Sequence, residues 1–509
     1  MNMHHLQTAH ADPARAQRLI FLSSLTIFIV GIALLTLATV HASVAIGEDE
    51  LISEGPTERV PVDENHMCGC GPSCACGDAC GCADASTVGP PIAPGLDGYP
   101  ASNVTLLGRI GITEFGSFTS GNDCWGYTSP SGREYAIMGL NSAAAFVEIT
   151  DPVNPQIIEI IPHPSSLWGD MKVYQHYAYV VNESGGGVQV IDMSQIDDGV
   201  VTLVRSVTSN GISTVHNVAV NEDSGYLYLC GANVGNGGLV ALSLADPANP
   251  VVAGAYTDTY VHDAQIVNYT EGPYAGREIA FCFVGSLGID IVDVTDKSNM
   301  FRMSRTTYEN IGYSHQGWIN MENQILYVDD ELERLLNLVP VTTTRVFDVS
   351  DLENPQAAGT FTTGLPAIAH NLYLRDGFIY QANYRSGLHI FDARDDPLDP
   401  EHVGWLDTFP SSNSANFNGA WSVYPFFPSG NVIISDLESG LLIVDPRPAV
   451  FTGASPDLSG DGAVGSADLA ILLGNWGPCP NPPAACPADL TGDGQVGAAD
   501  LAILLGEWG

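Results

Sequence analysis

The residues best placed to do chemistry are the oxygen-bearing side chains of two short repeats near the end of the chain. One repeat spans 457–468, and the other spans 489–500, 32 residues later. In each, oxygen side chains stand at positions 1, 3, 5 and 12, position 6 is glycine, and position 7 offers its carbonyl. Alternating oxygen ligands around a sharp glycine turn are what a calcium ion requires. The expected ligands are Asp457, Ser459, Asp461, Ala463 and Asp468, and Asp489, Thr491, Asp493, Gln495 and Asp500.

Each loop runs into the phrase Leu-Ala-Ile-Leu-Leu-Gly, which predicts a short apolar helix that ends at glycine. The pair, within residues 451–509, resembles type I dockerin repeats, calcium modules that dock onto cohesin-type partners. The resemblance implies two calcium sites and a cohesin-like or other cell-surface protein as partner. Ser459 and Thr491 stand where Asn or Asp is usual, and Gly465 and Gly497 leave position 9 to water. Fewer charged ligands should weaken both sites.

Eight of the eleven cysteines form two groups. Cys479 and Cys486 flank a proline-rich segment between the loops, and we expect a disulfide between them rather than free thiols. Three C-x-C pairs occur earlier: Cys68, Cys70, Cys74, Cys76, Cys80 and Cys82. Such pairs suit a soft metal such as Cu(I) or Zn(II), and outside the cytoplasm they equally suit disulfides. Metal, disulfides and free thiols all stay open for this cluster.

The N-terminal residues have the pattern of a targeting segment. Arg15 and Arg18 precede a run without charge, which predicts a cytoplasmic segment over 1–18 and a signal peptide or transmembrane anchor over 19–42. Residues 43–102 read as a linker rich in Cys, Gly and Pro. The remainder is therefore expected to be exported, extracellular or on the cell surface, with the membrane as a partner if the segment is not cleaved.

The composition excludes one class of partner. The chain has 509 residues, enough for two or more domains, and 58 acidic against 17 basic residues give a net charge of −41. Such a charge argues against nucleic acid as a partner.

An alternating phrase ending in aspartate recurs about every fifty residues between 103 and 450. Its seven copies are Phe146–Asp151, Val190–Asp192, Val240–Asp246, Ile289–Asp293, Arg345–Asp348, Leu388–Asp392 and Leu441–Asp445. Further strands flank each copy, so that a unit has four strands. Seven such units predict an all-β protein, a seven-bladed β-propeller, followed by the small α-helical calcium-loop module.

The ends of this region predict how the ring closes. Residues 103–110 have the pattern of a fourth, outer strand but no unit precedes them, and the seventh unit ends after its third strand. We expect the first strand to complete the last blade, because a closed ring leaves no long free edge. The phrases resemble the LVIVD-repeat propellers called choice-of-anchor B proteins. That resemblance implies an exported bacterial protein with a variable anchoring module, and it implies no established reaction.

Polar residues share one register on the strands expected nearest the axis. They are His216, His262, His315 and His370, with Asp123, Asp170, Asp263 and Trp421 at corresponding places. Equal register puts these groups at one level of the central channel. They could hold a divalent transition metal, line a polar pocket with tryptophan beneath a sugar ring, or bond neighbouring blades. We expect the aspartates to raise the imidazole pKa values, and the histidines to lie too far apart for one metal ion, around a wet pocket.

No nucleophile elbow, His-Glu-x-x-His motif or phosphate loop is present in the sequence. The sequence therefore favours an exported, surface-associated, non-enzymatic propeller that binds a protein or a glycan and docks through calcium. The rival is an extracellular polysaccharide-active hydrolase or lyase, metal-dependent, that uses the axial His and Asp ring. Dockerin-like tails often accompany such enzymes, which is an analogy.

Overall fold

The computed structural model describes residues 98–450, 456–459, 463–479, 486–491, 494–506 and 508. The expected leader or anchor over 19–42, the C-x-C cluster, and the calcium ligands Asp461 and Asp493 lie outside the described residues. Within the described part of the chain, no helix is long and apolar enough to cross a membrane.

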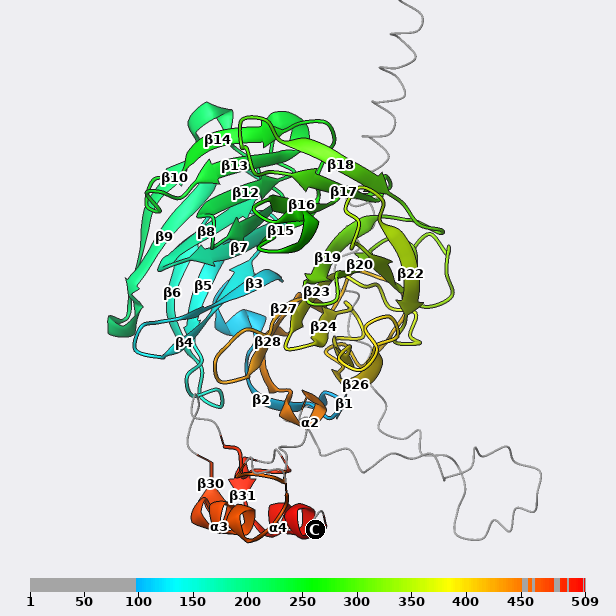
Figure 1. Ribbon diagram of the computed structural model, residues 1–509. Helices are drawn as coiled ribbons and strands as arrows, with labels where there is room; N and C mark the ends of the chain where they lie inside the picture. The colour runs from blue at the N-terminus through cyan, green and yellow to red at the C-terminus, as the bar shows by residue number, and fades with distance from the viewer. Residues whose placement is uncertain are drawn as a thin grey trace, which may run out of the picture. The chain divides into compact units, whose positions relative to one another are not determined.

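Seven antiparallel sheets surround one axis (Figure 1), which confirms the seven-bladed β-propeller. Blades one to three contain β3 (Gly121–Thr128), β4 (Glu134–Leu140), β5 (Ala143–Glu148), β6 (Gln156–Pro162); β7 (Gly169–Tyr174), β8 (Tyr177–Asn182), β9 (Val188–Gln195), β10 (Val200–Val207); and β11 (Asn217–Asn221), β12 (Tyr226–Cys230), β13 (Leu239–Ser243), β14 (Val251–Tyr256). Blades four and five contain β15 (Asp263–Asn268), β16 (Glu278–Phe283), β17 (Ile289–Asp293), β18 (Phe301–Thr306); and β19 (Ser314–Asn320), β20 (Ile325–Asp330), β21 (Thr344–Asp348), β22 (Gln356–Phe361). Blades six and seven contain β23 (Asn371–Arg375), β24 (Phe378–Ala382), β25 (Leu388–Asp392), β26 (Glu401–Leu406), β1 (Ala101–Ser102); and β27 (Ala420–Tyr424), β28 (Val432–Asp436), β29 (Gly440–Asp445), β2 (Thr105–Ile110).

Short helical turns occupy some connections. They are η3 (Ile112–Glu114), η4 (Ile196–Asp198), η5 (Ser209–Gly211), η6 (Gly235–Gly237), η7 (Gly272–Tyr274) and α2 (Arg447–Val450). The innermost strands of the seven blades are β3, β7, β11, β15, β19, β23 and β27. Each contacts the next one around the ring, and β27 contacts β3. The innermost strands therefore place their side chains around a single channel.

The predicted closure is confirmed. Strand β2 pairs antiparallel with β29, Thr105 opposite Asp445 and Ile110 opposite Leu441, so the start of the propeller completes its last blade. Strand β1 additionally pairs with β26 of blade six, Ser102 opposite Trp405, which the sequence did not predict. The N-terminal edge thus bonds to two blades and leaves no long open edge there.

The aspartate of the repeated phrase has a structural task. In five blades its Oδ1 accepts the backbone N–H two residues later, which turns the chain from the third strand towards the fourth. These aspartates are Asp192, Asp293, Asp348, Asp392 and Asp445. Such Asx turns substitute for a backbone hydrogen bond at the point where the strand ends. The repeated Asp is therefore part of the fold.

Glycine in the outermost strand lets neighbouring blades approach. A Cβ on Gly108 would lie 2.0 Å from the carbonyl oxygen of Pro152, and one on Gly254 would lie 1.6 Å from that of Lys297. Both contacts are far inside van der Waals distance, so only glycine fits where the turn of the next blade packs.

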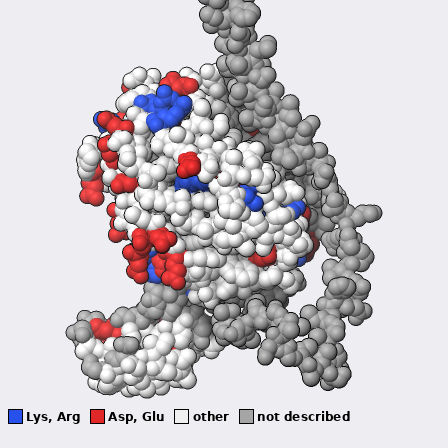
Figure 2. All heavy atoms as spheres, turned by 90° about the vertical axis from the view of Figure 1, so that its right-hand side faces the viewer, with Lys and Arg blue, Asp and Glu red and all other residues white. Residues whose placement is uncertain are grey.

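Apolar side chains fill the space between blades. Ile137 and Phe146 of blade one pack with Met171 and Val180 of blade two, for example. In the view of Figure 2, acidic side chains gather in clusters between broad uncharged areas.

The C-terminal module has two helices, α3 (Ser466–Gly474) and α4 (Ala498–Gly506). A short antiparallel pair, β30 (Gly477–Pro478) and β31 (Gln495–Val496), joins the two repeats. Leu472, Ala488, Leu490, Val496 and Leu504 form its small core. Cys479 and Cys486 form the expected disulfide.

Candidate metal centre

The four axial histidines come from consecutive blades. His216, His262 and His370 directly precede the innermost strands β11, β15 and β23, and His315 is the second residue of β19. Backbone N–H groups of the first three donate to the neighbouring second strands, at Cys230, Phe283 and Ala382. The sheet ladder of each blade therefore fixes the place of each imidazole.

The structure brings these histidines into contact. Ring centroids are 4.2 Å apart for His216 and His262, 4.3 Å for His262 and His315, and 4.2 Å for His315 and His370. The expectation of widely spaced histidines is wrong for consecutive blades. Consecutive blades place the rings as neighbours along an arc, and the width of the channel separates only groups from opposite blades.

One nitrogen of three rings is held by the next blade. His262 Nδ1 lies 3.1 Å from the carbonyl oxygen of His315, His315 Nδ1 lies 2.9 Å from that of His370, and His370 Nδ1 lies 2.5 Å from that of Trp421. A carbonyl oxygen only accepts, so each Nδ1 carries the proton. In a neutral ring the other nitrogen, Nε2, then presents a lone pair.

The pKa values favour the neutral rings. Burial first, and then neighbouring imidazoles, lower the pKa of His262 and His315 well below the ordinary value. Burial also lowers the pKa of His370 to about 3. The predicted increase caused by Asp123, Asp170 and Asp263 is therefore wrong. Neutral imidazole is the form that binds metal ions.

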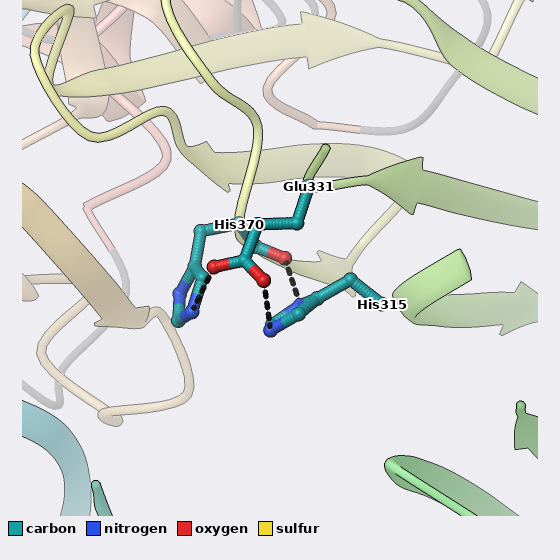
Figure 3. A group of neighbouring side chains, drawn as sticks. All are labelled: His315, Glu331 and His370. Atoms are coloured by element: carbon teal, nitrogen blue, oxygen red, sulfur yellow. Dashed lines mark hydrogen bonds and ion pairs between the residues drawn. The ribbon is translucent and has the colours of Figure 1, made fainter. Parts of the chain in front are cut away.

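A carboxylate faces two of the lone pairs. Glu331 Oε2 lies 3.7 Å from His315 Nε2, and Glu331 Oε1 lies 3.5 Å from His370 Nε2 (Figure 3). One ligand atom from each of these three buried residues lies within 4.8 Å of the others. Lone pairs of nitrogen and oxygen that face one another require a cation or a proton between them.

Two further groups fix Glu331. The Tyr384 hydroxyl donates to Glu331 Oε1 at 2.9 Å. Asp330, the preceding residue, accepts the backbone N–H groups of Gly312, Tyr313 and Glu333, which holds the connection after β20 against the axis. Tyr384 itself has φ of 37°, a strained value for a residue that is not glycine.

His216 extends the cluster at the other end. Its Nε2 lies 2.6 Å from His262 Nε2, and its Nδ1 lies 2.6 Å from Glu183 Oε1. His262 has its proton on Nδ1, so its Nε2 accepts and His216 Nε2 donates in this contact. Burial raises the pKa of Glu183, but the hydrogen bond from His216 and its charge bring the net pKa below the ordinary value.

The three predicted aspartates belong to a second level of the channel, together with Lys172. Its Nζ lies 2.6 Å from Asp170 Oδ1 and 4.5 Å from the centre of the Trp125 ring. Burial raises the pKa of Asp123 to about 7, and that of Asp263 to about 7. A lysine ammonium already supplies a positive charge to this group of carboxylates.

Trp421 takes part differently from the prediction. Its carbonyl accepts from His370, and its ring lies 4.8 Å from the His370 ring, edge to face. Glu331, Glu183 and Tyr384 were not singled out from the sequence. The signal for two of them was available, because each glutamate directly follows a second strand, and second strands end beside the start of the innermost strand.

The two loops that are predicted to bind calcium have a consistent local geometry. Asp468 Oδ1 accepts the N–H of Ser459, and Asp500 Oδ1 accepts the N–H of Thr491. Thr491 Oγ1 also lies 3.2 Å from Asp489 Oδ1. Positions 1, 3 and 12 thus meet in the second loop. The same positions of the first loop, Asp457, Ser459 and Asp468, are similarly arranged. Hydrogen bonds from the backbone, that of Gly465 first, lower the pKa of Asp468 and favour the charged form.

No protein-family model matches this sequence, and a comparison with curated protein sequences finds no match. Among solved structures, U3-55K is similar with a TM-score of 0.45 at 8% identity, over 67% of this chain and 98% of its own. A protein from Lactobacillus plantarum has a TM-score of 0.42 at 14% identity, over 57% of this chain and 84% of its own. Neither similarity assigns a function.

Proposed function

We propose that this protein is an exported metalloprotein whose propeller holds one divalent transition-metal ion at its axis. The ligands are the Nε2 atoms of His315 and His370 and the carboxylate of Glu331, whose ligand atoms lie within 4.8 Å of one another. The observation that carries the proposal is the fixed tautomer of these two rings, whose Nδ1 atoms donate to backbone carbonyls while their Nε2 atoms face Glu331.

This pattern is typical of histidines that bind metal. Such a histidine almost always donates its other ring N–H to a carbonyl or a carboxylate, which orients the ring and makes the ligand nitrogen more basic. Imidazole suits zinc, copper, iron and nickel, and one carboxylate is compatible with all four. The ion would also remove the repulsion between the facing lone pairs of His315, His370 and Glu331.

Two roles follow for the ion. In a non-enzymatic binding protein it stabilises the axial end of a propeller that recognises a protein or a glycan. In the second candidate, an extracellular hydrolase or lyase on polysaccharide, an ion with an open position activates water. The strained, buried Tyr384 next to Glu331 favours this second candidate, because strain of this kind concentrates at functional sites.

Metal content tests the centre. The full chain, with the six cysteines of the C-x-C cluster replaced by serine, should contain about one transition-metal ion after loading and desalting. His315→Ala and His370→Ala, each in that background, should weaken binding by at least about 10–100-fold. Inductively coupled plasma mass spectrometry measures the loss.

The matched control is His176→Ala, a half-exposed histidine in the turn between β7 and β8. It should retain the metal. If the two axial variants retain the metal as well, the axial residues are not its ligands, and the proposal is wrong.

We further propose that the C-terminal module binds two calcium ions and docks onto a cohesin-like or other cell-surface protein. The convergence of Asp489, Thr491 and Asp500 supports this proposal. The export segment over 19–42 would place both parts outside the cytoplasm, anchored in the membrane if it is not cleaved.

Calcium should increase the helical circular dichroism of the full chain. The loop carboxylates repel one another without a cation, and helices as short as α3 and α4 are marginal on their own. Asp468→Asn combined with Asp500→Asn should abolish the increase, because each removes the position-12 charge. Asp399→Asn, an exposed control in blade six, should respond normally. A normal response of the double variant would show that the ions bind elsewhere.

A further inference from the structure

The central channel contains a second feature, a cavity of about 120 Å³ that the metal proposal does not use. Its aromatic lining is Trp125, Trp318 and Tyr373, and its polar lining includes Asp263, Gln265 and Gln316. These residues lie on the innermost strands, further along the chain direction than the four histidines. The cavity is therefore separate from the metal centre.

Two glutamine amides in the lining have a fixed orientation. Gln316 is only 4% exposed, and its Oε1 accepts the N–H of Leu372 at 2.8 Å. Gln265 Oε1 accepts the N–H of Ile319 at 2.7 Å. Because an N–H must meet the amide oxygen, both amide nitrogens are left as donors, and no hydrogen bond from either is found within the part of the chain that the structure describes. Neither nitrogen is a buried atom without a partner, so both donors face accessible space, where water or a ligand can accept from them.

The remaining polar groups add an acceptor and limit the charge of a ligand. Asp263 accepts the N–H of Ala264 through one oxygen, and its carboxyl group lines the cavity. Lys172 also lines it, but its ammonium is bonded to Asp170 and lies over the Trp125 ring. With Asp123, Asp170 and Asp263 around a single lysine, a further anion would be repelled.

We propose that this cavity binds the terminal residue of a neutral glycan. Sugar hydroxyl groups accept from the two amides and donate to the Asp263 carboxylate, while the C–H face of the ring packs on the aromatic wall. The space of about 120 Å³ is smaller than a cavity of about 150 Å³ that holds benzene, so it takes up part of one sugar ring and excludes a second ring. The remaining sugar residues of the glycan would extend from the opening of the cavity.

The inference deepens the proposed role as a glycan-binding propeller and does not depend on the metal ion. Its test uses the full chain and the quenching of tryptophan fluorescence, because Trp125 and Trp318 form the wall. The probes are the methyl glycosides of glucose, galactose and mannose, with methyl galacturonide as the acidic comparison. At least one neutral glycoside is expected to bind, and the galacturonide is expected to bind at least about tenfold more weakly.

Gln316→Glu and Gln265→Glu are the decisive variants. A glutamate retains the oxygen that accepts from Leu372 or Ile319, but it removes the amide donors and adds a negative charge. Each should weaken binding about tenfold or more. The melting temperature of each variant, measured alongside, shows that the chain is still folded at the temperature of the binding experiment. Gln356→Glu, an exposed residue in β22, is the matched control and should bind like the parent.

Three outcomes overturn the proposal: no neutral glycoside binds, the galacturonide binds as well as the neutral sugars, or both glutamate variants bind like the parent. His315→Ala separates this site from the metal centre. It should lose the ion but still bind the glycoside, so failure of either proposal is visible on its own.

Discussion

Deleting residues 105–110 is expected to open the ring and to abolish cooperative unfolding near the melting temperature of the parent. The deletion removes the pairing partner of β29 and uncovers its backbone. Leu106 and Ile110 are 4% and 6% exposed, and each contributes about 1.5–3 kcal/mol by burial. Together with the lost ladder of hydrogen bonds, this approaches the total stability of about 5–15 kcal/mol that is typical of a domain.

Calorimetry measures this effect. A deletion of equal length in the linker, residues 89–94, is the control and should unfold like the parent. An unchanged transition after removal of β2 would contradict the closure, and aggregation of the deleted chain would agree with an exposed strand edge.

Asp436→Asn is expected to stabilise the protein above pH 7 and to leave its stability almost unchanged near pH 4. Asp436 ends β28 and is fully buried, and its Oδ1 accepts the N–H groups of Glu438 and Ser439. Burial, and next the charge of Glu438, raise its pKa from 3.8 to about 7. Asparagine retains the accepting oxygen and never carries the charge.

The direction of the pH effect follows from the number of protons that the folded and the unfolded states bind at Asp436. Between pH 4 and pH 7 the folded protein retains a proton on Asp436 that the unfolded chain has released, so stability from this group is lost as the pH rises through about 7. The difference in the free energy of unfolding between variant and parent should therefore grow over this pH range, to as much as about 4 kcal/mol. Urea denaturation at pH 4, 6 and 8 measures it.

The exposed Asp258→Asn is the control, and it should follow the parent at each pH. A difference between Asp436→Asn and the parent that does not change with pH would contradict a raised pKa at Asp436. Titration of the axial histidines occurs in both proteins and cancels in the difference.

The fold could be predicted because the repeated phrase includes the aspartate that forms the turn after the third strand. An aspartate that accepts from the residue two positions on, as Asp293 and Asp348 do, marks the end of the third strand in the sequence itself. The closure by β2 followed from counting strands. The pairing of β1 with β26 could not be predicted, since two residues carry no periodicity and their partner lies about 300 residues away.

The sequence predicted which strand positions carry the axial histidines, but it did not predict which side chains contact them. Equal positions in consecutive units identified His262, His315 and His370, because the ladder fixes where each strand begins. The carboxylate opposite them lies in the connection after β20, whose course depends on the hydrogen bonds of Asp330. Alternation along one strand also separated His262 from Asp263, which the sequence interpretation had placed at one level.

The pairing of Thr105 with Asp445 has a mechanical consequence. The chain enters and leaves the propeller at the same end of two adjacent antiparallel strands, so tension between the two exits pulls them apart from that end. The two pairs of β1 with β26 are the first to bear such a load, and the β2–β29 ladder then opens one hydrogen bond at a time. A strand pair loaded in this unzipping direction yields at lower force than one loaded in shear, so if the protein is held at both ends, the ring opens first where β2 leaves blade seven.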